Sequence, residues 1–396
     1  MTTILFDLDD TLLDTNMGQF LSAYFTALGE AFKDIASEDV LTRQIKYSVD
    51  EMSKNENPGK LLQDIFAEHF YAPLGTTEED CRQMLSHFYK AEFPKLKRIT
   101  NQKPEACELV KWCQSKEMTL VIATNPVFPD TATRQRIEWA GLGIDDFAYF
   151  SSYDNFHFTK PNLAYYAEAL GYLGWPDGPI VMVGDNVKLD LIPVETMGFP
   201  TFWLPSQPAE NSERPYGQLA DVRPWLQKLP KKEPYHLSTK IDVLLAVLRS
   251  TPAVLDTWTK KLPADSFFLS PENGEWSTAE IFCHLAEMEE NIYLPQWEHV
   301  LNEPNSLLQL INYCPANDLP TQNCPHPEDS FQKFLRLRLK SLDLINEISN
   351  RGYLPNQIDH MIFSGSTIHE LVTFSAKHDR LHLAQCANLL NIYKIN

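Results

Sequence analysis

The sequence predicts an α/β fold for the first half of the chain, a Rossmann-like parallel sheet with an inserted all-helical cap, followed by an all-α four-helix bundle domain. Three observations support this prediction. Short apolar segments alternate with helical patterns in the first half of the chain. A long stretch of purely helical periodicity interrupts this alternation after the first strand. Beyond a proline-rich segment only amphipathic helical patterns follow, which is typical of a helical bundle.

Five apolar segments are predicted to be buried strands, because each is too short for a helix and most are rich in β-branched or aromatic residues. They are residues 2–6, Thr119–Ala123, Phe147–Phe150, Ile180–Val183 and Thr201–Leu204. The helices predicted around them are Pro104–Gln114, Thr131–Ala140 and Asn162–Leu173. Strands that alternate with helices form a parallel sheet covered on both faces, and ligands bind at the carboxyl ends of such strands.

The cap is predicted over residues 15–100, between the first strand and the second. Aromatic and apolar residues recur there at helical spacing, as in the series Phe20, Tyr24, Leu28 and Phe32. The sequence of this stretch shows no strand pattern. Because the block directly follows the first strand, we expect it to cover the strand ends where a ligand binds.

The prolines between Pro205 and Pro234 predict the boundary between two domains. The expected domains are residues 1–206 (core 1–14 and 101–206, cap 15–100), a linker at 207–235 and a bundle at 236–396. The helices of the bundle are expected at residues 236–262, 277–302, 328–349 and 367–391. The long segment from Asn302 to Asp329 is expected to be a crossover loop.

Composition and charge limit the partners that the protein can have. The chain has 34 lysine and arginine residues against 53 acidic residues, a net charge of −19. Such a surface repels phosphate backbones and anionic lipid, so we expect no nucleic-acid binding and no membrane association. The seven cysteines form no Cys-x-x-Cys pair, and the N-terminus has no signal-peptide pattern. Reduced thiols and a cytoplasmic location are therefore expected.

Two carboxylates, Asp7 and Asp9, follow the first predicted strand. Neighbouring carboxylates at a strand end are unfavourable unless a cation or a difference in protonation relieves their repulsion. One of them can act as a nucleophile and the other as a general acid/base, with a magnesium ion that neutralises the charge. An aspartate-rich helix N-terminus is the structural alternative for this pair taken alone.

Polar residues follow the later strands in the same way. Thr124 and Asn125 follow the second strand and offer a hydroxyl and a backbone N–H to a phosphate oxygen. Lys160 follows the third apolar segment, where its ammonium can neutralise charge between these hydrogen-bond donors and the nucleophile. Asp185 and Asp190 follow the fourth strand and add the carboxylates that a magnesium site needs. These residues together favour an enzyme over a structural explanation.

The residues just described resemble the motifs of the haloacid dehalogenase (HAD) superfamily of phosphatases with a helical cap. The resemblance covers residues 1–205, and its first motif, Asp-x-Asp-x-Thr, is matched by Asp7, Asp9 and Thr11. The later motifs are matched by Thr124, by Lys160, and by Asp185 with Asp190. The helical insert after the first motif resembles the small helical cap of this family.

The resemblance implies a role for each of these residues. Asp7 would attack phosphorus and form an aspartyl-phosphate, and Asp9 would protonate the leaving alcohol and then activate water. Thr124 and Lys160 would hold the phosphoryl oxygens. The Asp7 carboxylate, the Asp9 main-chain carbonyl and Asp185 would bind Mg²⁺. Asp190 would orient Lys160 and the surroundings of the metal rather than coordinate directly.

The reaction expected from this resemblance is Mg²⁺-dependent hydrolysis of a small-molecule phosphate ester. The dehalogenase branch of the same superfamily is the alternative. Dehalogenation needs neither magnesium nor the second aspartate, because a halide leaves without a proton. Since the sequence has an aspartate at position 9, phosphate ester hydrolysis is favoured.

Three histidines of the second domain are candidate metal ligands. His378 and His382 are four residues apart and therefore share one face of the last predicted helix. His284 lies in the second helix, whose start is marked by Ser277 and Glu280 as a capping box. Two imidazoles one turn apart and a third from a facing helix form a three-nitrogen site with an open position, typical of a catalytic divalent metal. A solvated helix face is the alternative for the pair alone.

The segments around these histidines resemble the DinB superfamily of metal-binding four-helix bundles. They read Trp-Ser-x-x-Glu-Ile-x-x-His-Leu and His-Asp-x-x-His-Leu-x-Gln, and the resemblance covers residues 236–396. It implies that His284, His378 and His382 bind one metal, and neutral imidazoles favour Zn²⁺ or Ni²⁺ over Mg²⁺. Either a metal-dependent thiol transferase or a binding and assembly module fits this half of the chain. The resemblance leaves a homodimer open, because bundles of this family often pair.

Overall fold

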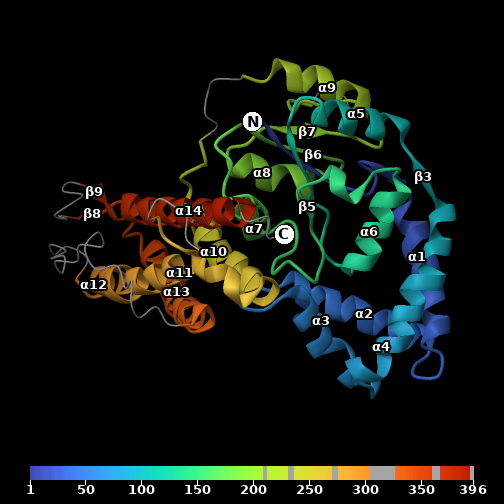
Figure 1. Ribbon diagram of the computed structural model, residues 1–396, viewed down its shortest axis with the longest axis horizontal. Coiled ribbons are helices and arrows are strands. Elements are labelled where there is room, and N and C mark those ends of the chain that lie inside the picture. Colours follow the sequence, from blue (N-terminus) through green and yellow to red (C-terminus); the bar gives the residue numbers. More distant parts are fainter. Residues whose placement is uncertain (208–211, 231–235, 270–274, 304–325, 359–365, 393–396) are drawn as a thin grey trace. The chain divides into compact units, whose positions relative to one another are not determined.

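The structure is a computed structural model that describes residues 1–207, 212–230, 236–269, 275–303, 326–358 and 366–392 (Figure 1). It divides into two compact units. The first comprises Met1–Tyr166 and Pro176–Leu237, and the second comprises Ala167–Trp175 and Ser238–Asn396. None of the helices in the described ranges combines the length and the apolar character that crossing a lipid bilayer requires.

The first unit contains a parallel sheet of five strands in the order β5-β4-β1-β6-β7. The strands are β1 (Thr3–Phe6), β4 (Thr119–Ile122), β5 (Tyr149–Phe150), β6 (Ile180–Gly184) and β7 (Thr201–Trp203). Strand β1 lies between β4 and β6, and all four of its residues are buried. The predicted parallel sheet is confirmed, and each predicted strand is found, although the third is reduced to two residues.

Helices follow the strands as the alternation predicts. They are α5 (Pro104–Gln114), α6 (Asp130–Trp139), α7 (Leu163–Tyr172) and α8 (Ile192–Thr196), with a π-helical turn η5 (Val187–Leu191) before the last of them. In α6 the residues Ala132, Thr133, Arg136 and Ile137 are buried, so one face of this helix packs inward.

Part of the segment predicted to be a linker is helical instead. Helix α9 (Leu219–Lys228) buries Leu219, Val222 and Leu226 and packs against α5. Its sequence contains Pro224, which removes one helical hydrogen bond and is therefore typical of an interrupted helix or a loop. Burial of the three apolar side chains outweighs that local preference, and the division into domains with a proline-rich linker over residues 207–235 stays a prediction.

The insert after β1 is helical, as predicted. Its elements are α1 (Met17–Ala31), α2 (Glu38–Ser53), α3 (Leu62–Phe70), η1 (Ala72–Leu74), α4 (Glu78–His87), the π-helical η2 (Phe88–Glu92) and η3 (Phe93–Ile99) (Figure 1). Aromatic side chains hold these helices together, and Phe20, Tyr24, Phe88 and Phe93 pack edge to face in its core. The periodicity in the sequence thus marks the buried faces correctly.

A short antiparallel ribbon, absent from the sequence prediction, marks both ends of this insert. Strand β2 (Leu13–Thr15) pairs with β3 (Thr100–Gln102), with Leu13 opposite Gln102 and Thr15 opposite Thr100. Each strand has three residues, too few to show an alternating pattern. The chain therefore enters and leaves the cap through adjacent, hydrogen-bonded strands.

The second unit contains the predicted bundle. Its helices are α10 (Ile241–Lys261), α11 (Thr278–Met288), α12 (Leu294–Asn302), α13 (Pro327–Asn350) and α14 (Ile368–Ile392), with shorter elements η6 (Ala264–Phe268), η7 (Glu289–Tyr293), β8 (Gln357–Ile358) and β9 (Ser366–Thr367). The predicted helix 277–302 is α11 and α12 joined by η7, a π-helical turn. Helix α13 packs against α10, α11 and α12. Most of the predicted crossover loop lies outside the described residues.

Candidate functional site

Asp7 follows directly after β1, at the carboxyl end of the central strand, and only 8% of its surface is exposed. Its carboxylate accepts a hydrogen bond of 2.8 Å from Lys160 Nζ, which also donates to Asp190 Oδ1 at 2.6 Å. Lys160 is buried, and burial alone would lower its pKa. The charges of Asp190 and Asp7 outweigh burial and hold the pKa of Lys160 well above its ordinary value.

Three carboxylates meet at this edge of the sheet. Oxygen atoms of Asp7, Asp185 and Asp190 all lie within 4.8 Å of one another. Burial, followed by the charges of Asp7 and Asp190, raises the pKa of Asp185 to about 7. Burial, with the charge of Asp7, raises the pKa of Asp190 to about 6 even though Lys160 opposes the shift. One lysine does not neutralise three carboxylates, and hard oxygen donors with excess negative charge fit a magnesium ion.

Asp9 has partners of its own. Its Oδ1 accepts a hydrogen bond of 3.1 Å from Thr15 Oγ1 in the ribbon strand β2. Its Oδ2 is ion-paired with Arg136 Nη2. Burial lowers the pKa of Arg136 to about 10, which leaves the guanidinium charged at neutral pH. The sequence carries no signal for Arg136, because nothing in its sequence neighbourhood distinguishes a buried arginine from an exposed one.

The residues after β4 are held by hydrogen bonds from Ser151, from Tyr165 of α7 and from the backbone of Lys160. The carbonyl of Thr124 accepts from Ser151 Oγ at 2.7 Å and from Tyr165 OH at 2.8 Å. Asn125 Oδ1 accepts from the backbone N–H of Lys160 at 3.2 Å. Since β4 is the direct neighbour of β1, Thr124 and Asn125 lie at the same edge of the sheet as Asp7.

A cavity of about 720 Å³ opens beside the carboxylate cluster. Asp185 lines it together with Asp10, Asp14 and Lys103. Lys103 Nζ donates a hydrogen bond of 3.2 Å to the carbonyl oxygen of Thr11 and another to that of Asp10, and burial lowers its pKa. The cavity gives a small molecule access to the side chains at the strand ends.

Gly184, the last residue of β6, leaves no room for a side chain. A Cβ atom there would lie 2.5 Å from Asp190 Oδ2 and 2.7 Å from Asp190 Cγ. We expect Gly184→Ala to displace Asp190 from Lys160 and to lower the free energy of unfolding by about 1–3 kcal/mol, as overpacking of buried sites does. Thermal unfolding measures this loss. Gly18→Ala is the control, because a Cβ there lies 3.5 Å from its nearest neighbour. Equal stability of the two variants would contradict the expectation.

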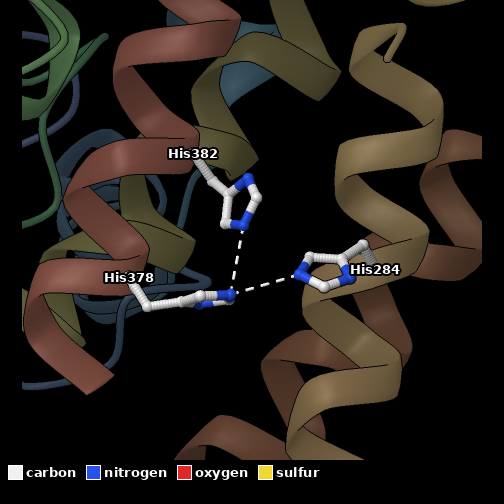
Figure 2. Close-up of side chains that lie close together, drawn as sticks. All are labelled: His284, His378 and His382. Carbon is white, nitrogen blue, oxygen red and sulfur yellow. Dashed lines mark hydrogen bonds between the residues drawn. The ribbon is translucent and has the colours of Figure 1, made fainter. Parts of the chain in front are cut away.

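Three histidines converge in the second unit (Figure 2). His284 comes from α11, and His378 and His382 come from α14. The Nε2 atom of His378 lies 3.1 Å from Nε2 of His284 and 3.1 Å from Nε2 of His382. Two nitrogens bound to one tetrahedral zinc at about 2.1 Å lie about 3.4 Å apart. The three ring nitrogens are therefore spaced close to what a single metal ion requires.

The protonation of the cluster also suits a cation. His382 Nδ1 lies 2.7 Å from Gln385 Oε1, so Nδ1 donates and Nε2 keeps its lone pair. Burial, then the neighbouring imidazoles, lower the pKa of His284 to about 3. Burial and the charge of His382 likewise lower the pKa of His378 to about 3. Neutral imidazoles with converging lone pairs repel one another, and a bound divalent cation removes that repulsion.

The triad has an aromatic neighbour and a buried ionic neighbour. The ring of Trp276 lies parallel to that of His382, at 6.0 Å between centroids. Asp379, the residue after His378, is ion-paired with Arg338 of α13, which also pairs with Glu289, and the Arg338 Nη2–Asp379 Oδ1 distance is 3.1 Å. All three of these charged residues are buried. Through these ion pairs, Arg338 links both α14 and η7, the direct continuation of α11, to helix α13.

The stability of the metal-free second unit should depend on pH. The ordinary pKa of His284 is 6.5 and the folded value is about 3. As the pH falls, His284 therefore binds a proton in the unfolded chain before it does so in the folded chain. The free energy of unfolding consequently falls as the pH falls from about 7 toward 3. Between pH 7.5 and 5.5 the loss is about 1.4 kcal/mol for one such histidine. Urea unfolding of the chelator-treated protein at both values measures it. His284→Gln should remove this part of the slope, and an unchanged slope would refute the assignment.

Comparison with known proteins matches each half of the chain. Residues 1–198 match the family model of the haloacid dehalogenase-like hydrolases, and residues 248–386 match that of the DinB superfamily. Both resemblances expected from the sequence are confirmed. No curated protein matches the chain.

Three solved structures illustrate the similarity. The 2-haloacid dehalogenase from Pseudomonas syringae pv. Tomato DC3000 is 21% identical over 58% of this chain and 99% of its own, with a TM-score of 0.43. A HAD phosphatase from Thermococcus onnurineus is 17% identical over 57% of this chain and 98% of its own, with a TM-score of 0.40. YfiT from Bacillus subtilis, with a four-helix bundle topology, is 17% identical over 42% of this chain and 94% of its own, with a TM-score of 0.34.

Proposed function

The chain belongs to the haloacid dehalogenase-like hydrolases through residues 1–198, and on that premise we propose that it is a magnesium-dependent phosphatase. The substrate is a small-molecule phosphate monoester, hydrolysed through an aspartyl-phosphate on Asp7. One observation supports this best. Asp7 at the end of the central strand shares Lys160 with Asp190, within 4.8 Å of Asp185. A buried ammonium beside the nucleophile neutralises the charge of an incoming phosphoryl group.

The residues of the site divide the work of the reaction. Asp7 attacks phosphorus and the alcohol leaves, and Asp9 gives the leaving oxygen its proton and later takes one from the attacking water. Thr124, Asn125 and Lys160 hold the phosphoryl oxygens. Asp190 fixes Lys160 through the 2.6 Å hydrogen bond. Positioning and neutralisation of charge supply most of the catalysis in phosphoryl transfer.

The donor set at the sheet edge fits Mg²⁺, which favours oxygen ligands. The Asp7 carboxylate, the Asp9 main-chain carbonyl and Asp185 would hold the ion, and it would supply further neutralisation of phosphate charge. Burial, followed by the charges of Asp7 and Asp190, raises the pKa of Asp185 to about 7, and a bound cation would offset both effects.

The experiment that tests this function is a screen of phosphorylated metabolites with the full chain. Phosphate release is measured with Mg²⁺ and again with a chelator. The proposal is supported if phosphate is released from one compound class with Mg²⁺ and this release stops when the chelator is added. A chelator-resistant release of halide from 2-haloacids, with no release of phosphate, would replace it by the dehalogenase alternative. The ion pair between Asp9 and Arg136 gives Asp9 a defined place in the site and favours the phosphatase.

For the second unit we propose a divalent metal site on His284, His378 and His382, with Zn²⁺ or Ni²⁺ as the ion. The converging Nε2 atoms and the lowered pKa values support it. Three protein ligands leave a fourth position open for water or a thiol. Thiol transfer by the metal-loaded protein distinguishes an enzyme from a binding and assembly module, and the same samples show by sedimentation whether the protein forms a homodimer.

We also propose a cytoplasmic location. The cysteines in the described part of the chain, Cys81, Cys107, Cys113, Cys283 and Cys386, are all free thiols. Free thiols without a disulfide framework are typical of a reducing compartment. The net charge of −19 supports small-molecule substrates over nucleic acid or anionic membranes.

A further inference from the structure

Arg136 is a buried cation next to the candidate active site. It lies in α6, and 1% of its surface is exposed. Its Nη2 atom pairs with Asp9 Oδ2, and its Nε atom has no hydrogen-bond partner among the described residues. Removing a guanidinium from water is costly unless its interactions compensate. The pairing with Asp9 and the nearby charge of Asp7 offset this cost.

Two neighbouring aromatic rings contact the guanidinium. Its central carbon lies 4.9 Å from the ring centroid of Phe128, in the loop before α6, and 5.7 Å from that of Phe20. Phe20 belongs to α1, the first helix of the cap, and is completely buried. A cation over two ring faces is fixed in position as well as stabilised. Arg136 is therefore in contact with the sheet domain, with the cap and with Asp9 at once.

Both oxygens of the Asp9 carboxylate are restrained by this part of the molecule. Thr15, which donates to Oδ1, lies in β2 where the chain enters the cap. Arg136, which pairs with Oδ2, rests on the first cap helix through Phe20. The direction in which the Asp9 side chain points is thus set by groups at the base of the cap.

We propose that Arg136 is a positioning residue for Asp9, and that it makes the placement of the acid/base carboxylate depend on the cap through Phe20. This proposal rests on the proposed phosphatase function. Arg136 does not touch the phosphoryl group, and it acts by holding Asp9 where the leaving oxygen is protonated. Its loss should therefore affect turnover more than binding, and should matter most for leaving groups that need a proton.

The test compares two phosphate esters that differ in their leaving group. Phenyl phosphate releases a basic phenolate, whereas p-nitrophenyl phosphate releases a stabilised one that needs less help from an acid. With Arg136→Met we expect kcat for phenyl phosphate to fall about 10–100-fold, a part of what acid/base catalysis contributes, with KM changed less than about threefold. The loss for p-nitrophenyl phosphate should be smaller. Asp9→Asn should show the same pattern more strongly, and Arg136→Lys should restore part of kcat.

Matched variants separate positioning from packing. Arg134→Met changes an exposed arginine of the same helix that pairs with Asp130 instead. This variant should leave kcat for both esters within about twofold of the wild-type value, because surface substitutions usually have small effects. Phe20→Leu should show a weaker form of the Arg136→Met pattern. Phe32 is an equally buried aromatic residue beside Phe70, and Phe32→Leu should not show this pattern. Equal loss for both esters in Arg136→Met, or an unchanged kcat, would overturn the proposal.

A second measurement does not depend on activity. The unfolding temperatures of Asp9→Asn, Arg136→Met and the double variant form a double-mutant cycle. Non-additive shifts support the pairing, and additive shifts overturn it. If the wild-type protein hydrolyses neither ester nor any other phosphate, the phosphatase function fails, and the cycle still decides whether Arg136 holds Asp9.

Discussion

Asp7→Asn should abolish phosphate ester hydrolysis while the fold stays intact. An amide cannot form the acyl phosphate that a carboxylate forms, so the first chemical step has no nucleophile. Removing a nucleophile typically costs at least about 10⁴-fold in kcat. The fold should survive, because asparagine has the same shape and still accepts a hydrogen bond from Lys160, which lies 2.8 Å from Asp7 Oδ1. Steady-state kinetics with Mg²⁺ measure the loss.

The control for this prediction is Asp39→Asn, the same substitution at an exposed position of α2. It should leave turnover unchanged. Circular dichroism and thermal unfolding show whether Asp7→Asn remains folded. A folded Asp7→Asn protein with wild-type turnover would exclude the aspartyl-phosphate route, whatever the substrate.

His382→Ala should remove most of the metal from the second unit. It takes away one of three converging nitrogens, 3.1 Å from His378 Nε2. Loss of a group that merely hydrogen-bonds to a metal ligand costs about 10–100-fold in affinity, and loss of a ligand itself costs more. The zinc and nickel content of the full chain after dialysis, measured by mass spectrometry, gives the result. Phosphatase turnover in Mg²⁺ should not change.

The matched control is His369→Ala on the same helix, because His369 Nε2 lies 2.7 Å from the carbonyl oxygen of Thr239 and takes no part in the triad. Its metal content should equal that of the wild type. If His382→Ala binds zinc as tightly as His369→Ala does, the three-histidine site is not the metal site.

The sequence predicts those parts of the molecule that local patterns determine. Asp7 and Asp185 follow strands that are visible as apolar segments, so a parallel sheet brings them to one edge. His378 and His382 share a helix face through their spacing alone. These patterns depend on the period of the strand or helix and on little else.

Other features depend on contacts between distant segments and have no local signal. Arg136 and Arg338 are buried because Asp9, Glu289 and Asp379 lie close to them in the folded chain. Solvation favours an exposed arginine, so sequence alone predicts the opposite. Helix α9 forms around a proline because its apolar face is covered, and the ribbon of β2 and β3 exists only as a pair.

That ribbon makes the cap an exchangeable insertion. Because Thr15 lies opposite Thr100, the chain departs from the sheet domain and returns to it at one point. An insert with adjacent ends adds loop-closure entropy only slowly as it lengthens. Over evolution, the segment above the strand ends can therefore be replaced or resized while the strand order and the catalytic side chains stay as they are. The same place suits protein engineering, where a short hairpin turn would close the ribbon or a different insert would be grafted onto it.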